Sequence, residues 1–204
     1  RYEFKSKKSM NKSVYILDYR CGNVKSVSRA FLSNGYAVKK IIYNNLPKES
    51  ILVIPGVGHF GYAMDFIKRN NVDKLIKSHF FKGGKILGIC LGMQLLFEES
   101  EEAPGVKGLG ILKGKVRKLL IQNKDSVQKM HLGWSKTKFK KNLDHDMYYV
   151  HQFFCDPFDK SIINETFEWG GQDLCAGIKS NNIRGFQFHP EKSSKAGLEL
   201  ISTI

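Results

Sequence analysis

The first 90 residues alternate short apolar runs with segments of helical periodicity, and this alternation limits the fold more than any other feature. In residues 23–35, Val24, Val27, Ala30 and Phe31 fall on one helical face, and Gly35 can end the helix. The ranges predicted as strands are 13–17, 36–42, 51–54 and 83–89, and those predicted as helices are 23–35, 62–70 and 72–81. This order is typical of a parallel, doubly wound α/β sheet.

The pattern changes beyond residue 110, where strands follow one another with short turns between them. The predicted strands are 111–119, 126–134, 147–154, 174–180 and 183–188, and a helix is expected over 193–204. We therefore expect a mostly parallel central sheet with an antiparallel or mixed extension. No repeat or long linker divides the chain, so residues 13–204 are predicted to form one domain, preceded by a basic arm or leader over residues 1–12.

Composition excludes several classes of protein. Of 204 residues, 42% are hydrophobic and 25% are charged, as in globular proteins. The longest strongly apolar stretch, 86–97, contains Gln94 and is shorter than the ~20 residues of a membrane span, so no membrane association is expected. The four cysteines lie far apart without CxxC spacing. That spacing favours a cytoplasmic protein and indicates neither a metal site nor a cofactor.

The formal net charge of +14 raises the question of a nucleic-acid or acidic partner. Lysines and arginines occur along the whole chain, and in 113–118 and 136–141 they alternate with other residues, as on the solvent faces of strands. No aromatic motif that reads RNA accompanies them. The distribution favours a solvated basic surface, and a basic RNA-binding module remains the non-enzyme alternative.

Cys90 lies between two glycines in G-I-C-L-G, where a predicted strand runs into a predicted helix over residues 91–99. A nucleophile elbow has this form, because Gly88 and Gly92 permit a tight turn that exposes the central side chain. The N-terminus of the following helix would favour a thiolate and help to stabilise an oxyanion. The spacing alone leaves a second interpretation open, in which Cys90 is a small buried hydrophobic residue.

A thiolate catalyst needs a general base and a group that orients the base. In F-Q-F-H-P-E, His189 follows the strand predicted over 183–188, and Glu191 lies two residues further on. Pro190 fixes the turn between them. Of the other histidines, His59 and His151 follow or lie in short apolar runs, and the segments around positions 79, 131 and 145 have no carboxylate arrangement of this kind. His189 is therefore the candidate base.

A glycine-rich loop, I-P-G-V-G-H-F-G, follows the strand predicted over 51–54. Gly56, Gly58 and Gly61 leave the backbone N–H groups uncovered, so the loop can donate to an oxyanion. The same letters match the dinucleotide pattern GxGxxG. That match is weak, because the loop follows the third strand and no acidic ribose ligand occurs at the expected distance.

Together, G-I-C-L-G-M-Q-L-L-F-E, F-Q-F-H-P-E-K-S and I-P-G-V-G-H-F-G resemble the motifs of triad-type class I glutamine amidotransferases over residues 13–204. The resemblance implies Cys90 as nucleophile, His189 as acid and base, and Glu191 as orienting carboxylate. It also implies that glutamine binds near Gly58, Leu91 and Gln94, with the N–H groups of Val57 and Leu91 as oxyanion donors.

Within that family, D-Y-R-C-G-N-V-K-S-V, H-L-G-W-S-K and Y-Y-V-H-Q-F-F resemble segments of the glutaminase subunits of imidazole glycerol phosphate synthases. Such subunits pass ammonia to a separate (β/α)8-barrel cyclase subunit, which acts in histidine biosynthesis. The resemblance implies a heterodimer with that partner. It places Asn23, Trp134, Tyr148 and Lys192 at the interface.

Two segments depart from the pattern of these subunits. D-Y-G-x-G-N is usual where this chain has Arg20 and Cys21 after Tyr19, and P-H-M-G-W-N is usual where it has Met130, Leu132 and Ser135. An alternative is therefore a paralogue that supplies ammonia to an N-acetyl-sugar amidotransferase in surface-polysaccharide biosynthesis. A further alternative is a cysteine hydrolase on the same scaffold that acts on other amides.

Overall fold

The computed structural model describes residues 13–41, 46–120, 130–141 and 143–204, so the predicted arm over 1–12 lies outside it. The helices are α1 (Val24–Ser33), α2 (Phe60–Arg69), α3 (Val72–Phe81), α4 (Leu91–Gln94) and α5 (Ser194–Ser202), with short 3-10 turns η1 (Lys160–Ile162) and η2 (Pro190–Lys192). The strands are β1 (Ser13–Leu17), β2 (Ala37–Ile41), β3 (Ile51–Ile54), β4 (Lys85–Ile89), β5 (Glu99–Ser100), β6 (Gly114–Lys118), β7 (His131–Phe139), β8 (His145–His151), β9 (Phe153–Pro157), β10 (Ile163–Trp169), β11 (Gln172–Ser180) and β12 (Ile183–Phe186).

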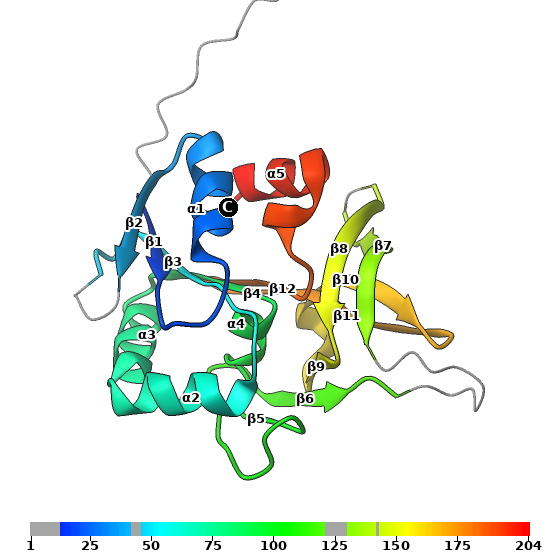
Figure 1. Cartoon of the computed structure of the whole chain (residues 1–204), viewed down its shortest axis with the longest axis horizontal. Coiled ribbons are helices and arrows are strands. Elements are labelled where there is room, and N and C mark those ends of the chain that lie inside the picture. Colours follow the sequence, from blue (N-terminus) through cyan, green and yellow to red (C-terminus); the bar gives the residue numbers. More distant parts are fainter. Residues whose placement is uncertain (1–12, 42–45, 121–129, 142) are drawn as a thin grey trace, which may run out of the picture.

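A nine-stranded sheet in the order β2-β1-β3-β4-β12-β11-β10-β7-β8 forms the centre of the molecule (Figure 1). The five strands from β2 to β12 run parallel. The strands from β11 to β8 pair antiparallel. The predicted fold class, a parallel α/β sheet with an antiparallel extension, is confirmed. None of the helices formed by the described residues is long and apolar enough to cross a membrane.

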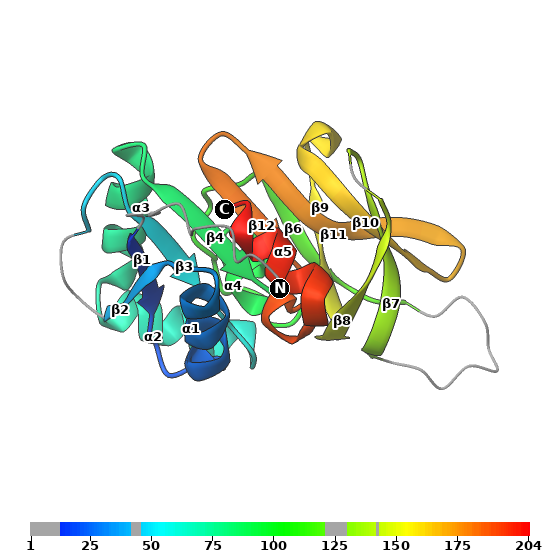
Figure 2. The ribbon, with the colours of Figure 1, turned by 90° about the horizontal axis from the view of Figure 1, so that it is seen from above.

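Helices cover both faces of the parallel half: α2 and α3 lie on one side of it (Figure 1), and α1 and α5 lie over the face that Figure 2 shows. The strand β3 reads Ile-Leu-Val-Ile, and all four of its residues are buried, because alternate side chains enter different cores. Leu52 and Ile54 pack in the core that includes α2 and α3. Ile51 and Val53 pack in the core that includes α1 and α5. The edge strand β2 is mostly exposed and carries two lysines, which suits an unpaired edge.

Two strand predictions in the second half of the chain were wrong in detail. The run 147–154 is divided between β8 in the large sheet and β9 in a small sheet ordered β5-β6-β9. Of the range 126–134, only 130–134 is described, and β7 begins at His131 and continues to Phe139. β10 was not predicted, although its sequence, Ile-Asn-Glu-Thr-Phe-Glu-Trp, alternates in the way that strands do.

The helix predicted after Cys90 is also much shorter than expected, since α4 ends at Gln94 and Glu99 lies in β5. The backbone carbonyls of Leu95, Leu96 and Phe97 accept hydrogen bonds from the N–H groups of residues 109–112 instead. These tertiary bonds and the burial of three large side chains outweigh helix propensity in this segment. A helix dipole at Cys90 is therefore limited to a single turn.

Candidate active site

The turn at Cys90 has a conformation that ordinary residues rarely adopt. Cys90 has φ 52° and ψ −112° directly after β4. A Cβ atom on Gly92 would lie 1.8 Å from the carbonyl oxygen of Ile54, and one on Gly88 would lie 2.6 Å from the Cα atom of Met93. Both glycines are therefore required by close backbone contacts. The predicted elbow is present.

Parallel pairing of β4 with β12 brings the segment that leads to Cys90 next to the segment that leads to His189. Ile89 lies opposite Phe186, and the N–H of Cys90 donates to the carbonyl of Phe186 at 2.7 Å. The chain beyond β12 therefore starts beside Cys90 and reaches His189 two residues after Gln187. Neighbouring parallel strands end at the same edge of the sheet, which is where sites form in such folds.

His189 and Glu191 form a buried pair. The ring Nδ1 of His189 lies 2.9 Å from Oε1 of Glu191, and both side chains are 2% exposed. Among the described residues, Nε2 of His189 has no hydrogen-bond partner of ordinary geometry, so this atom is available to a reacting group. Burial alone would lower the pKa of His189. The negative charge of the Cys90 sulfur and then the Glu191 carboxylate outweigh burial and raise this pKa to about 10.

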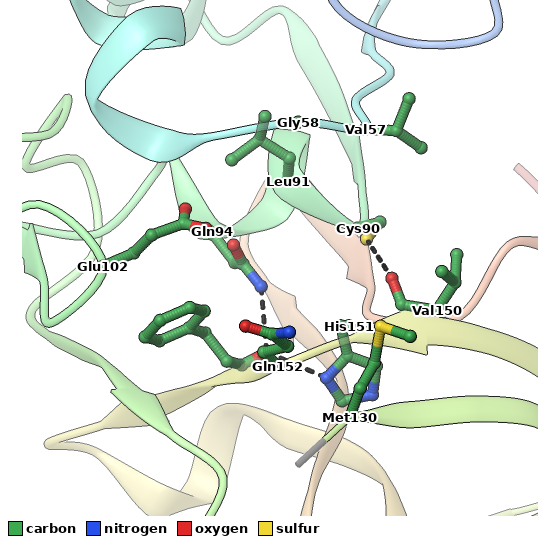
Figure 3. Close-up of a pocket in the computed structure, with 11 residues that line it drawn as sticks. Val57, Gly58, Cys90, Leu91, Gln94, Glu102, Met130, Val150, His151 and Gln152 are labelled. Carbon is green, nitrogen blue, oxygen red and sulfur yellow. Dashed lines mark hydrogen bonds between the residues drawn. The ribbon is translucent and has the colours of Figure 1, made fainter.

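A cavity of about 200 Å³ opens beside Cys90 (Figure 3). Cys90 is only 5% exposed, but it lines this cavity, so its sulfur is not sealed in the core. The four residues predicted to bind substrate line the same cavity: Val57, Gly58, Leu91 and Gln94. The structure therefore brings together every residue assigned to the nucleophile and the substrate site.

Six residues of the cavity wall were not predicted: Glu102, Met130, Val150, His151, Gln152 and Phe153. Glu102 is the only carboxylate in the described lining, and its Oε2 accepts a hydrogen bond of 2.7 Å from the N–H of Phe60. In the sequence it stands in a short acidic run without any pattern of its own. Only the folding of this run against the start of α2 places it in the site.

The loop after β3 is held against the elbow by Tyr19. The buried Tyr19 hydroxyl donates to the carbonyl of Pro55 at 2.5 Å. A Cβ atom on Gly56 would lie 2.6 Å from that hydroxyl and 2.8 Å from the Cβ atom of Leu91. Gly58 has φ +126°, which strongly favours glycine. These contacts seat Val57 and Gly58 beside Cys90.

Three of the four predicted interface residues form one cluster. Trp134 on β7 pairs in register with Tyr148 on β8, and their rings meet edge to face at 5.9 Å. The Nζ atom of Lys192 lies 5.7 Å from the centre of the Tyr148 ring. Trp134 remains 52% exposed. Asn23 is the N-cap of α1, and its side chain accepts from the N–H of Ser26 at 3.1 Å. A role of these residues at an interface stays a prediction.

The two departures from the family pattern have visible consequences. Arg20, where glycine is usual, has φ 62° and so keeps a conformation that glycine adopts more easily. Ser135, where asparagine is usual, places its Oγ atom 2.6 Å from Nε2 of His131. Neither of these two residues lines the cavity beside Cys90, but Met130, where proline is usual, does.

The remaining histidines have other surroundings. His59 caps α2, and His79 packs against Gly84. His131 and His151 form a buried pair, with Nδ1 of His131 3.1 Å from Nε2 of His151. Burial lowers the pKa of His131 to about 4, and burial together with the neighbouring His131, since both rings cannot easily be protonated at once, lowers the pKa of His151 to about 3. His151 is thus a neutral member of the cavity wall.

The sequence model of the family described as "Glutamine amidotransferase class-I" matches residues 15–202. Among curated proteins, the chain is similar to the protein named imidazole glycerol phosphate synthase subunit HisH of Chlorobaculum tepidum, with 38% identity over 94% of this chain and 98% of the relative. The protein of the same name from Aquifex aeolicus is 39% identical over 93% of this chain and 94% of its own length.

Solved structures share the fold at low sequence identity. A glutamine amidotransferase crystal structure superposes with a TM-score of 0.71 at 14% identity, covering 94% of this chain and 99% of that one. The structure of PurLQS from Thermotoga maritima gives a TM-score of 0.70 at 18% identity, covering 95% of this chain and 98% of that one. By its motifs, fold and relatives, this chain belongs to the class I glutamine amidotransferase family, in the branch that contains the HisH subunits.

Proposed function

We propose that this chain hydrolyses glutamine to glutamate and ammonia with a Cys90–His189–Glu191 triad. The observation that carries the proposal is the arrangement at Cys90, where a strained nucleophile elbow in the cavity wall lies beside a buried histidine–carboxylate pair. The raised pKa of His189 supports it further, because a protonated imidazole beside Cys90 favours the thiolate and can supply a proton to a leaving amine.

Substrate binding follows from the chemistry of the cavity wall. Free glutamine carries an ammonium group, and the carboxylate of Glu102 is suited to bind it. The side-chain amide of the substrate then lies toward Cys90. The N–H groups of Val57 and Leu91 are proposed to donate to the amide oxygen as it becomes negative.

The first step forms a thioester. The Cys90 thiolate attacks the side-chain carbonyl carbon of glutamine, and the electron pair of the C=O bond moves to oxygen. When the tetrahedral intermediate collapses, the C–N bond breaks, and the proton on Nε2 of His189 passes to the departing nitrogen, which leaves as ammonia. Glu191 holds the ring and stabilises its positive charge from Nδ1.

The second step restores the enzyme. His189, now neutral, takes a proton from water as the water oxygen attacks the thioester carbonyl. The C–S bond breaks, glutamate is released, and the sulfur returns to the thiolate while His189 is protonated again.

We also propose that the ammonia passes to a separate (β/α)8-barrel cyclase subunit, which uses it to form imidazole glycerol phosphate and aminoimidazole carboxamide ribotide in histidine biosynthesis. The curated relatives favour this pathway over amidation of an N-acetyl sugar. The exposed Trp134 beside Tyr148 and Lys192 is the surface proposed to meet the partner. The four free cysteines fit a reducing compartment, proposed to be the cytoplasm.

The test measures ammonia released from glutamine by the chain alone and with the barrel cyclase of the same organism. We expect weak activity alone and strong stimulation by the partner. C90A should lower activity by about 10⁴-fold or more while the protein stays folded. The matched control, C175A, removes a buried thiol from β11 and should keep activity. Retained hydrolysis in C90A would reject the proposal.

A further inference from the structure

Gln187 is a fully buried polar residue that the proposed mechanism does not use. It follows β12 directly, is 0% exposed, and is fixed through its backbone N–H, which donates to the carbonyl of Ala176 at 2.8 Å. Its side-chain Nε2 lies 3.5 Å from Sγ of Cys90, within hydrogen-bond distance for sulfur. A neutral amide therefore reaches the nucleophile from the side of the strand that also leads to His189.

The direction of this amide is set by a backbone carbonyl. Nε2 of Gln94 lies 3.0 Å from the carbonyl oxygen of Phe153 and 3.1 Å from Oε1 of Gln187. A carbonyl only accepts, so the side of Gln94 that faces Phe153 must be its NH₂ group, and the atom of Gln187 that faces Gln94 must be its oxygen. The other end of Gln187, which faces Cys90, is consequently its NH₂ group.

The ring of His151 is a second donor to the carbonyl of Phe153. Nδ1 of His151 lies 2.9 Å from the Phe153 oxygen, so Nδ1 carries the proton and donates. His151 has no tendency to gain another proton near neutral pH, because its pKa is lowered to about 3 by burial and by the nearby His131. The chain of bonds from Phe153 through Gln94 to Gln187 thus has one consistent set of proton positions.

The sulfur also has an acceptor within reach. The carbonyl oxygen of Val150 lies 3.9 Å from Sγ, where it can accept a hydrogen bond from the thiol but repels a thiolate. The donor from Gln187 has the reverse preference, since it stabilises negative charge on sulfur and gains little from a neutral thiol. Gln187 therefore acts against Val150 in setting the charge of Cys90.

We propose that Gln187 is a second stabiliser of the Cys90 thiolate, besides His189, and that Gln94 positions it. The proposal rests on the proposed function in that it assigns a role at the same nucleophile. An amide donor can hold the sulfur without exchanging a proton with it, so its contribution continues after His189 has given its proton to ammonia. Sulfur that leaves the thioester as a thiolate is stabilised by the same N–H group.

Other titratable groups around the sulfur do not supply such a donor. They are His189 with Glu191, the neutral His151, and Tyr19 and Cys155, whose pKa values burial raises well above their ordinary values. Of these described groups only His189 is held protonated near neutral pH, and Glu102 adds a carboxylate elsewhere in the cavity wall. Substitutions at Gln187 therefore change the surroundings of sulfur without removing a titrating group.

The test measures the rate at which iodoacetamide alkylates Cys90 as a function of pH, with the modified peptide identified by mass spectrometry. Q187M removes the donor, and Q187E keeps the shape and the acceptor for Gln94 while adding negative charge. We expect the midpoint of the Cys90 profile to rise by roughly one pH unit in Q187M and by more in Q187E, with about a tenfold loss in kcat/KM for glutamine hydrolysis. If Q187M does not fold, Q187E carries the test.

T137V is the matched control. Thr137 is also fully buried, and its hydroxyl bonds to that of Tyr149 at 2.6 Å, so this variant loses a buried hydrogen bond without touching the sulfur. Its alkylation midpoint should equal that of the wild type. Unchanged midpoints in both Gln187 variants would overturn the proposal, as would an equal shift in T137V. A shift in the Gln187 variants of a chain that never hydrolyses glutamine would overturn the proposed function and leave this assignment standing.

Discussion

Two buried histidines near Cys90, His189 and His151, have opposite charge states. His189 follows β12, and its pKa is raised to about 10, whereas His151 ends β8, and its pKa is lowered to about 3. Both are more than nine-tenths buried. Burial lowers the pKa of either ring, so the difference must come from what each ring faces.

The partners of the two rings explain the difference. The Cys90 sulfur supplies negative charge beside His189, and Nδ1 of the ring faces the Glu191 carboxylate. The ring of His151 lies between the carbonyl of Phe153 and the neutral ring of His131, neither of which carries negative charge. The positive charge of His189 also lowers the pKa of His151. His189 is therefore equipped for proton transfer, whereas His151 in the cavity wall is held neutral.

The largest expected effect on this difference comes from removing the Glu191 carboxylate. E191Q should lower kcat/KM for glutamine by on the order of 10²-fold or more, because His189 loses one of the two negative charges that stabilise its protonated form, the other being the Cys90 sulfur. Since that pKa is raised, the proton is retained up to about pH 10 in the wild type and should be lost at lower pH in the variant. Nitrogen NMR of the imidazole and the pH profile of kcat/KM measure both effects.

E98Q is the control for this experiment, because Glu98 forms an exposed ion pair with Lys113 at 2.7 Å, away from the cavity lining. It should leave the titration of His189 unchanged. An E191Q variant with the wild-type profile would show that Glu191 does not set the charge of this histidine.

A second variant sharpens the comparison by placing a carboxylate beside the neutral pair of His131 and His151. Ser135 lies 2.6 Å from Nε2 of His131, so S135D places a carboxylate where the hydroxyl now lies. The pKa of His131, lowered to about 4 by burial, should rise by about 2 units or more, which NMR titration measures. S135N, which restores the residue usual in the family, adds no charge and should not produce this rise. If His131 stays neutral in the S135D variant, burial outweighs the partner.

The smallest expected effect concerns stability in acid. The pKa of His131 is lowered in the folded protein, so below about pH 6.5 the unfolded chain binds a proton that the folded chain refuses, and stability falls as the pH drops toward 4. H131F keeps an aromatic ring against Tyr149, on which His131 now stacks at 4.3 Å, but it cannot titrate. Between pH 7 and 4.5, the free energy of unfolding of H131F should fall by about 1 to 2 kcal/mol less than that of the wild type.

Urea unfolding at several pH values measures this slope. H145F, at an exposed position on β8, controls for the loss of a histidine in general. Parallel curves for H131F and the wild type would mean that the buried pair does not resist protonation.

The sequence predicted the elements of the first half of the chain more accurately than those of the second half. The bounds of β1, β3 and α3 were predicted to the residue, because apolar periodicity and the Gly and Asn residues between elements are local signals. The run 147–154 was predicted as one strand because nothing local marks the point where the chain passes from the large sheet to the small one. The helix over 91–99 was overestimated for the same reason, since the bonds from residues 109–112 that end it come from far along the chain.

The sequence by itself determined the candidates for the nucleophile, the base, the carboxylate and the loop beside them, because elbow glycines and a His-Pro-Glu turn are short patterns whose chemistry is local. Only the tertiary structure decided which side chains complete the cavity and its surroundings, as with Glu102, His151 and Gln187. Their roles depend on contacts between segments up to 97 residues apart, such as that of Gln187 with Cys90, and on how much water burial removes around each group. Neither quantity is encoded in the neighbours of a residue along the chain.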